Sequence, residues 1–251
     1  MATLGLNRGH HLQPGHRDRY AGISARAARP RRGVRLVPVR GTPFFLSYAR
    51  ARDGSAHPGT ARSPDLIAER LFDDLRENLG QLIALPTGAD IGFIDRGMWG
   101  GTKWPAELAR EVGTCQVLVA LVSAPYMGSE WCGKEWYAFT NRVPRQLPGA
   151  QASNHHGCVI PVRWAPVELG MPSPLREDMF FTPDSAPEPD LPELYRQNGI
   201  FGILRMGLED YYQIIAWQLS MLISKVYYSL HLEPRNFGPE DLKNAFEPGA
   251  S

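Results

Sequence analysis

The chain has 251 residues, 43% of them hydrophobic, and a formal net charge of +1 at pH 7. This length and composition suit one α/β domain with appendages and exclude a wholly disordered chain. The near-neutral balance of charge gives no global field that would draw the chain to nucleic acid or to a membrane surface.

Three cysteines, an odd number without a CxxC pair, argue against a disulfide framework or a zinc ribbon. They suit a reducing, cytoplasmic location. The N-terminus lacks the apolar core of a signal peptide. The most apolar long segment, residues 211–232, is interrupted by Gln213, Gln218 and Lys225, so a membrane span is not expected.

Charge is concentrated in residues 1–40, where nine arginines stand against one acid, Asp18. Few apolar residues and no clear periodicity predict a disordered basic arm. Such an arm can act as an electrostatic tether to nucleic acid or lipid. A solvated tail, or an upstream extension that is not translated, explains the same composition. The folded domain itself is expected to bind no nucleic acid.

The folded part begins with a short apolar run at residues 43–47, which predicts a first buried strand. A polar loop follows. Ser63 then has the character of an N-cap, with Pro64 at the first helical position. Leucines and isoleucine recur at helical spacing behind it and predict an amphipathic helix over residues 64–82.

A second strand is predicted at residues 90–95, and a glycine-rich loop, residues 96–102, leads into a helix at about 103–112. Residues 116–123 form the clearest strand. Their continuous apolar run indicates a central parallel strand that is covered on both faces. A helix at about residues 130–142 follows.

A fourth strand is predicted at residues 158–163. The proline-rich segment 165–192 has the composition of a long surface excursion. A short helix at 192–205 and a long, largely apolar helix at 208–231 complete the domain. The predicted organisation is a basic arm at 1–40, a domain at 41–235 and a flexible tail at 236–251.

This alternation of strands and helices predicts an α/β fold: a flavodoxin-like, doubly wound parallel sheet of four to five strands with helices on both faces. Ligands of such sheets bind at the carboxyl ends of the strands. Three segments of unusual composition, Ser47–Asp53, Asp95–Trp104 and Ser123–Glu135, are therefore expected along one edge.

Several familiar site patterns are missing: GxxxxGK[ST], GxGxxG after the first strand, HExxH and GxSxG. His155 and His156 lie in a polar loop without a partner at ligand spacing, so they are interpreted as a solvated pair. Neither histidine-based catalysis nor a metal site is expected. Carboxylates near the predicted crevice remain as the candidates for chemistry.

Three segments together resemble the TIR domain family. Residues 44–50, FFLSYAR, are similar to its first box, and residues 93–104, FIDRGMWGGTKW, resemble its second box with the BB loop. Residues 117–136 resemble the central strand and the Ser-x-Trp-Cys-x-x-Glu element. The resemblance spans about residues 43–232, and it looks closest to actinobacterial TIR-like proteins that accompany FxSxx-type peptide maturation genes. The loop at 97–101 lacks the family's common proline.

The resemblance implies either cleavage of the nicotinamide–ribose bond of NAD or assembly with other TIR domains, including copies of itself. In enzymatic members the motif glutamate is catalytic, and that position is Glu135 here. NAD is then a substrate, and no prosthetic group is expected. The residues implied to bind NAD are Phe45, Ser47, Tyr48, Asp95, Trp104 and Trp131.

One carboxylate suffices for this chemistry, because the nicotinamide departs neutral and the developing oxocarbenium needs only charge stabilisation. Glu135 also has a structural interpretation, since a glutamate near a helix start is favoured by the helix dipole. Cys132 is interpreted as a small buried hydrophobe. Trp131 and Trp136 diverge on the helix, so one is expected in the core and the other at the cleft.

Two further functions compete with the NAD-cleaving enzyme. A non-catalytic TIR module would work by homotypic assembly through the BB loop and surface helices. A nucleoside deoxyribosyltransferase-like enzyme would share the sheet and a catalytic glutamate. The Ser-x-Trp-Cys-x-x-Glu element favours a TIR domain over this last class.

Overall fold

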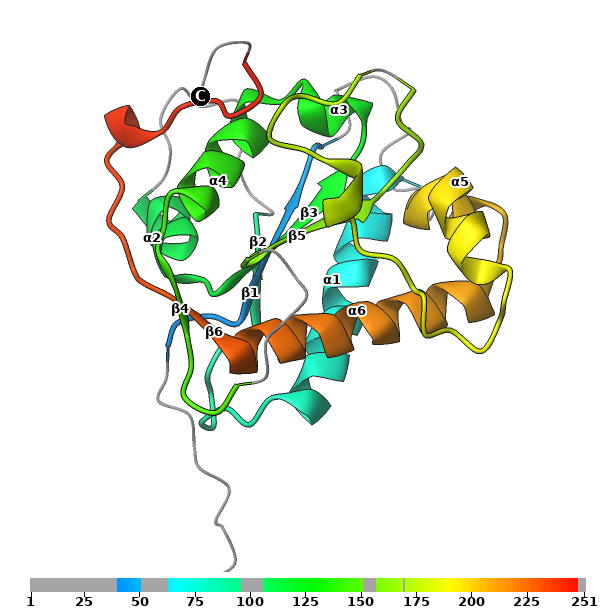
Figure 1. Ribbon diagram of the computed structural model, residues 1–251, viewed down its shortest axis with the longest axis horizontal. Coiled ribbons are helices and arrows are strands. Elements are labelled where there is room, and N and C mark those ends of the chain that lie inside the picture. The colour runs from blue at the N-terminus through cyan, green and yellow to red at the C-terminus, as the bar shows by residue number, and fades with distance from the viewer. Residues whose placement is uncertain (1–39, 51–62, 96–105, 151–156, 169, 248–251) are drawn as a thin grey trace, which may run out of the picture. The chain divides into compact units, whose positions relative to one another are not determined.

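The core of the protein is a parallel sheet of four strands in the order β2-β1-β3-β5 (Figure 1). The strands are β1 Phe44–Tyr48, β2 Gly92–Ile94, β3 Val117–Val122 and β5 Val159–Arg163. The computed structural model describes residues 40–50, 63–95, 106–150, 157–168 and 170–247. The predicted basic arm, apart from Arg40, and the glycine-rich loop lie outside these ranges. The α/β, flavodoxin-like fold is confirmed.

Helices cover both faces of the sheet. They are α1 Pro64–Leu82, α2 Ala106–Thr114, α3 Ala124–Met127, α4 Glu130–Thr140, α5 Leu191–Arg205 and α6 Glu209–Ser229. Figure 1 shows α2 and α4 on one side of the sheet and α1 and α6 on the other, where α1 packs against α6. None of the described helices is both long and apolar enough to cross a lipid bilayer.

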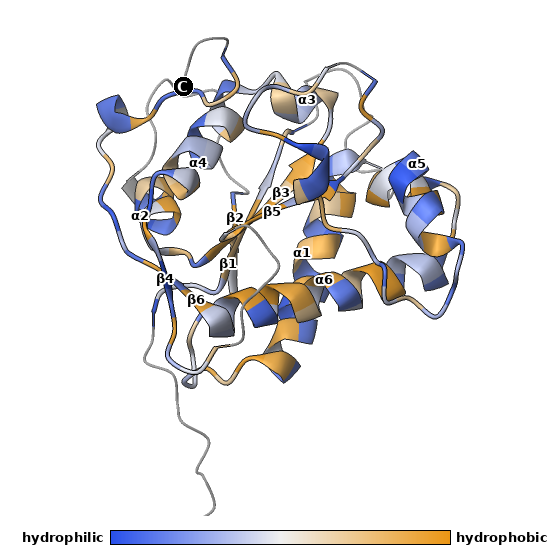
Figure 2. Ribbon diagram, in the orientation of Figure 1, coloured by the Kyte–Doolittle hydropathy of each residue, from blue (hydrophilic) through white to orange (hydrophobic). Residues whose placement is uncertain are grey.

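Strand β3 is the centre of the core, and each of its six residues is buried. Backbone hydrogen bonds pair it with β1 on one side and with β5 on the other. Figure 2 colours this strand as hydrophobic, as expected for a strand that helices cover on both faces. The sequence prediction of residues 116–123 as the central strand is therefore accurate to one residue at each end.

Helix α1 also agrees with its sequence pattern. Pro64 stands at its start, where a missing N–H costs no intrahelical bond. Its buried residues repeat at helical spacing and face the sheet: Ile67, Ala68, Leu71, Phe72, Leu75 and Leu79. Helix α1 packs against α6 and β2, and Phe72 packs its ring against Phe44 of β1 at 5.5 Å between centroids.

Two features were not expected from the sequence. Strands β4 Pro144–Gln146 and β6 Leu230–Leu232 form a small antiparallel sheet. Each has only three residues, and the residues of β4 are exposed, so no alternating apolar pattern marks them. The proline-rich segment 165–192 is more than a surface excursion, because it contains a 3-10 turn, η1 Glu177–Met179, and buries Phe180 and Phe181.

The C-terminal residues differ from the flexible tail expected at 236–251. Residues 237–247 contain a second 3-10 turn, η2 Pro239–Asp241, and lie against the body of the domain. Phe237, Leu242 and Ala245 are buried there. Apolar side chains at irregular spacing anchor this segment, so its sequence has neither helical nor strand periodicity.

Candidate functional site

A crevice opens at the carboxyl ends of the strands. This is the edge of the sheet at which the sequence predicts a ligand site. Its volume is about 320 Å³, at the small end of ligand pockets. The end of β1, the residue after β2 and the start of α4 line it. Its polar lining residues are Ser47, Tyr48, Arg50, Asp95, Ser129 and Glu135.

Helix α4 carries Glu135 into this crevice. Ser129 caps the helix, with its hydroxyl oxygen accepting the Cys132 N–H at 3.3 Å. Cys132, Trp136 and Phe139 are buried at the spacing of one helical face, and Glu135 lies on that same face. A carboxylate at this position therefore points toward the sheet rather than into solvent, and the Glu135 residue is only 6% exposed.

A short chain of hydroxyls supports the buried carboxylate. Ser47 Oγ, near the end of β1, donates to Glu135 Oε2. The hydroxyl of Tyr126, from α3, lies 3.1 Å from Ser47 Oγ. Ser47 has one hydroxyl proton and gives it to Glu135, so Tyr126 is the donor in the second bond. The result is a hydrogen-bond chain from Tyr126 through Ser47 to Glu135, buried at each member.

The environment strongly changes the acidity of Glu135. Burial raises its pKa from an ordinary value near 4.5 to about 8, and the Ser47 hydroxyl limits this rise. The charge of Asp95 raises the pKa further, whereas that of Arg50 lowers it. At neutral pH the carboxyl group of Glu135 is therefore largely protonated. A carboxyl with a pKa near working pH in a cleft is typical of functional sites.

The thiol of Cys132, near Glu135, is a poor candidate for a nucleophile. Cys132 is 2% exposed, and burial, with the charge of Glu135, raises its pKa above the usual range of a thiol. A neutral, buried thiol is a poor nucleophile. The structure therefore agrees with the interpretation of Cys132 as a small hydrophobe of the core.

The rim of the crevice combines aromatic and charged groups. Arg50 Nη2 donates to the backbone oxygen of Asp95 at 2.5 Å and lies 3.6 Å from its carboxylate. Burial raises the pKa of Tyr48 to about 12, so its hydroxyl stays protonated. Trp131 lines the crevice while remaining 37% exposed, and Lys134 Nζ lies 5.3 Å from its ring centroid. The described residues of the rim thus offer flat rings and the guanidinium of Arg50 to a ligand.

The two tryptophans of α4 diverge as their spacing predicts. Trp131 lies at the crevice, and Trp136 is 1% exposed in the core. Among the other predicted residues, Ser47, Tyr48 and Asp95 line the crevice with Glu135. Trp104 and Asp53 lie outside the described residues.

Phe45 does not line the crevice, which corrects the prediction that it binds ligand. It is fully buried, with its ring stacked on Phe93 at 5.4 Å and tilted against Phe139 at 5.9 Å. Phe45 shares a face of β1 with Ser47, but it lies two residues further from the strand end. Side chains of β2 and α4 therefore cover it.

Two residues of the site were missed from the sequence. Arg50 contributes the guanidinium of the rim, and Tyr126 begins the hydroxyl chain. Both residues lie within segments that carry the family resemblance. The sequence does not indicate their roles, because only the fold brings Tyr126 within reach of β1.

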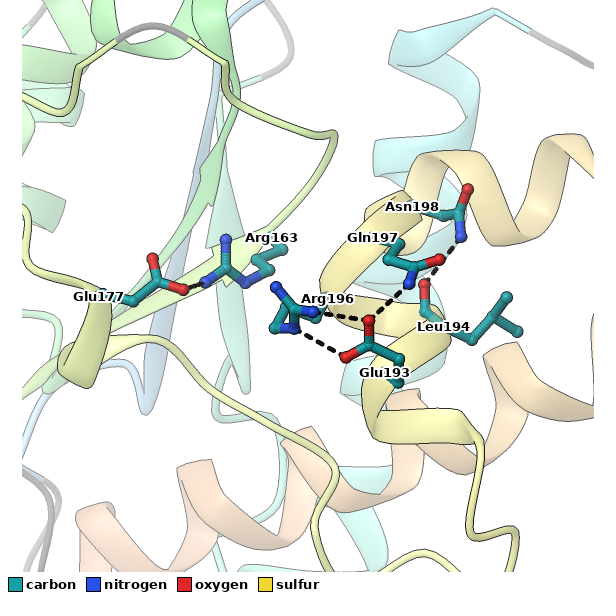
Figure 3. Close-up of polar contacts among 7 residues, drawn as sticks. All are labelled: Arg163, Glu177, Glu193, Leu194, Arg196, Gln197 and Asn198. Atoms are coloured by element: carbon teal, nitrogen blue, oxygen red, sulfur yellow. Dashed lines mark hydrogen bonds and ion pairs between the residues drawn. The ribbon is translucent and has the colours of Figure 1, made fainter.

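A second polar cluster lies beside the carboxyl end of β5 and is drawn in Figure 3. Arg163, the last residue of β5, pairs with Glu177 and lies over the ring of Phe180 at 4.5 Å. On α5, Glu193 accepts hydrogen bonds from Arg196 and Gln197. Glu177 and Glu193 are exposed and each contacts a guanidinium, so this cluster is explained as surface ion pairing.

Within the described ranges, no three His, Cys, Asp or Glu side chains are grouped so that they could hold a metal ion. All three cysteines are free and buried. The crevice of Glu135 is therefore the arrangement of described residues that is best equipped for chemistry.

Comparison with known families gives one match. The model of the TIR domain family matches residues 44–185, more than half of the 251 residues. No curated protein and no solved structure matches the chain. The matched range contains the crevice residues from Ser47 to Glu135.

Proposed function

The chain belongs to the TIR domain family, and from this premise we propose that it cleaves the nicotinamide–ribose bond of NAD with Glu135 as the catalytic carboxylate. The observation that carries the proposal is the buried carboxyl of Glu135, bonded to a hydroxyl at the floor of an open crevice. The crevice volume of about 320 Å³ suits the nicotinamide–ribose end of the dinucleotide rather than the whole molecule.

Substrate binding would activate Glu135. The nicotinamide ring of NAD is a cation, and a cation near a carboxyl group lowers its pKa. A carboxyl group that is mostly protonated in the free enzyme therefore releases its proton to solvent as the substrate enters. The desolvated negative charge then lies beside the bond that breaks, where electrostatic stabilisation is strongest. Ser47 holds this carboxylate through its donated hydrogen bond.

The reaction then follows from charge. The bond between ribose C1′ and the nicotinamide nitrogen breaks, and its electron pair stays on nitrogen, so nicotinamide leaves as a neutral molecule. The ribose becomes an oxocarbenium-like cation that the carboxylate of Glu135 stabilises. Water adds to C1′ and gives up one proton, which a base with a pKa near 8 can accept. The products are ADP-ribose, nicotinamide and a proton.

The aromatic rim would orient the substrate. Trp131 and Tyr48 stand at the crevice with rings that can stack on nicotinamide or on the ribose face. Arg50 lies at the same rim, and its side chain is 31% exposed. Its guanidinium is a suitable contact for the diphosphate of NAD. Each of these groups recognises a part of NAD that is flat or anionic.

Self-association is part of the proposal. The exposed indole of Trp131 leaves the rim of the crevice open, so a neighbouring copy could complete it. We therefore expect turnover to rise more steeply than in proportion to protein concentration. The three free cysteines suit a reducing cytoplasm, where NAD is available.

The test follows nicotinamide release from NAD over a range of protein concentrations, with and without a crowding agent. Wild-type protein is expected to turn over at high concentration, and Glu135→Ala is expected to be inactive. Equal turnover by both proteins would remove Glu135 from the mechanism. Absence of turnover from both at every concentration would instead favour a TIR interaction module.

A further inference from the structure

The C-terminal residues 237–247, named the C-terminal strap here, lie against the helix that carries Glu135. They fall outside the residues 44–185 that match the TIR family. In Figure 1 the red end of the chain passes beside α4, and the backbone N–H of Ala245 donates to the carbonyl of Gly133 at 3.2 Å. The strap is therefore bonded to the first turns of α4.

Gly133 permits this close contact. A Cβ atom at this position would lie 1.7 Å from Asn244 Oδ1 and 2.7 Å from its Cγ. Glycine inside a helix is less favourable than alanine, so Gly133 lowers the intrinsic stability of α4. Asn244 Oδ1 in turn accepts the N–H of Phe246 at 3.0 Å, which fixes the turn that presents Phe246.

Phe246 reaches the back of the candidate site. Its ring centroid lies 5.7 Å from that of Tyr126 and 5.8 Å from that of Trp136. Both of those rings are buried, and Tyr126 is the first donor of the hydroxyl chain to Glu135. A ring of this size limits the positions that the Tyr126 ring can adopt.

We propose that the C-terminal strap is a positioning element for Glu135, with Phe246 holding Tyr126 so that its hydroxyl stays bonded to Ser47. Phe246 acts through Tyr126 and does not touch the crevice itself. The effect of the strap on NAD cleavage rests on the proposed function. Its effect on the protonation of Glu135 does not rest on that function.

The test is a titration of Glu135 in protein with ¹³C-labelled glutamate carboxyls, assigned by comparison with Glu135→Gln. Tyr126→Phe removes the first donor and is expected to raise the pKa of Glu135 by about 0.5–1 pH unit. Phe246→Ala is expected to raise it in the same way. The double variant is expected to show no further rise, because both changes break the same chain.

Two further variants separate positioning from general loss of packing. Gly133→Ala, which favours the helix, should displace Asn244 and raise the pKa of Glu135 as Phe246→Ala does. Phe201→Ala is the matched control, because Phe201 is also partly buried and packs on Trp164 at 5.7 Å, away from the crevice. It is expected to leave the pKa of Glu135 unchanged.

An unchanged or lowered pKa of Glu135 in Phe246→Ala would overturn the positioning role, as would shifts that add in the double variant. NAD cleavage is measured in parallel. A rise of 0.5–1 unit corresponds to about 3–10-fold lower kcat/KM at pH 7, because the free enzyme holds a smaller fraction of carboxylate. If wild-type protein fails to cleave NAD while the pKa pattern holds, the proposed function fails and the strap's role stands.

Discussion

Two glutamates beside the carboxyl edge of the same sheet differ in almost every physical respect. Glu135 is 6% exposed and bonds to the hydroxyl of Ser47. The side chain of Glu177 is 61% exposed and pairs with the guanidinium of Arg163. Solvent reaches Glu177 and one guanidinium contacts it, so it is a typical surface ion pair. Burial leaves Glu135 with a pKa of about 8, which prepares it to change charge when a ligand arrives.

The first expected difference between the two glutamates concerns the pH dependence of catalysis. The free enzyme needs the carboxylate form of Glu135, so kcat/KM for NAD cleavage should rise about tenfold per pH unit below pH 8 and level off above it. Nicotinamide release measured from pH 6 to pH 9 checks this. A flat profile over that range would mean that Glu135 is not the titrating group.

Removing the donor to Glu135 should move this profile. Ser47→Ala takes away the hydrogen bond that lowers the pKa of Glu135, so the midpoint of the profile should rise by about one unit. kcat/KM at pH 7 should then fall about tenfold, with a smaller loss at pH 9. Ser220→Ala is the matched control, since Ser220 is a buried serine of α6 that bonds to Ala216. A profile that does not shift in Ser47→Ala would contradict this role.

The free energy of unfolding should also depend on pH through the raised pKa of Glu135. The pKa of Glu135 is higher in the folded than in the unfolded chain, so between pH 4.5 and about 8 the folded state holds more of this proton. This one group should lower the free energy of unfolding by about 1.4 kcal/mol per pH unit as the pH rises through that window. Urea unfolding at several pH values should show this slope reduced in Glu135→Gln and retained in Glu177→Gln. Equal slopes in all three proteins would contradict it.

The smallest effect is expected in the exposed cluster. Arg196→Ala removes the ion-pair partner of Glu193 on α5, where both side chains are more than half exposed. Solvent already screens this pair, so its loss should leave both the unfolding midpoint and the pH profile unchanged within error. A clear loss of activity in Arg196→Ala would instead make the cluster in Figure 3 part of the site.

Much of the fold follows from local sequence. The apolar run of β3 and the helical repeat of α1 each specify one structure, and the structure agrees with both predictions. The edge where the site lies follows from parallel topology, which gathers the strand ends together. Glu135 was identified through the resemblance to TIR domains, because a glutamate near a helix start is common for structural reasons alone.

What the sequence does not specify depends on contacts between distant residues. Tyr126 reaches Ser47 across 79 positions of the chain, so no local pattern assigns it to the hydroxyl chain. Phe246 packs on Tyr126 from a segment that was expected to be flexible. Phe45 was assigned to the site by its place on β1, but side chains from β2 and α4 cover it. The high pKa of Glu135 likewise arises from tertiary burial.

The most direct test of the central claim compares nicotinamide release by Glu135→Gln and Glu177→Gln with that of wild-type protein, at pH 8 and high protein concentration. Glutamine keeps the shape of each side chain and removes its charge. Loss of the stabilising carboxylate should slow Glu135→Gln at least about 1000-fold, whereas Glu177→Gln should stay within about twofold of wild type. Turnover by Glu135→Gln at the wild-type rate, or an equal loss in both variants, would contradict the account.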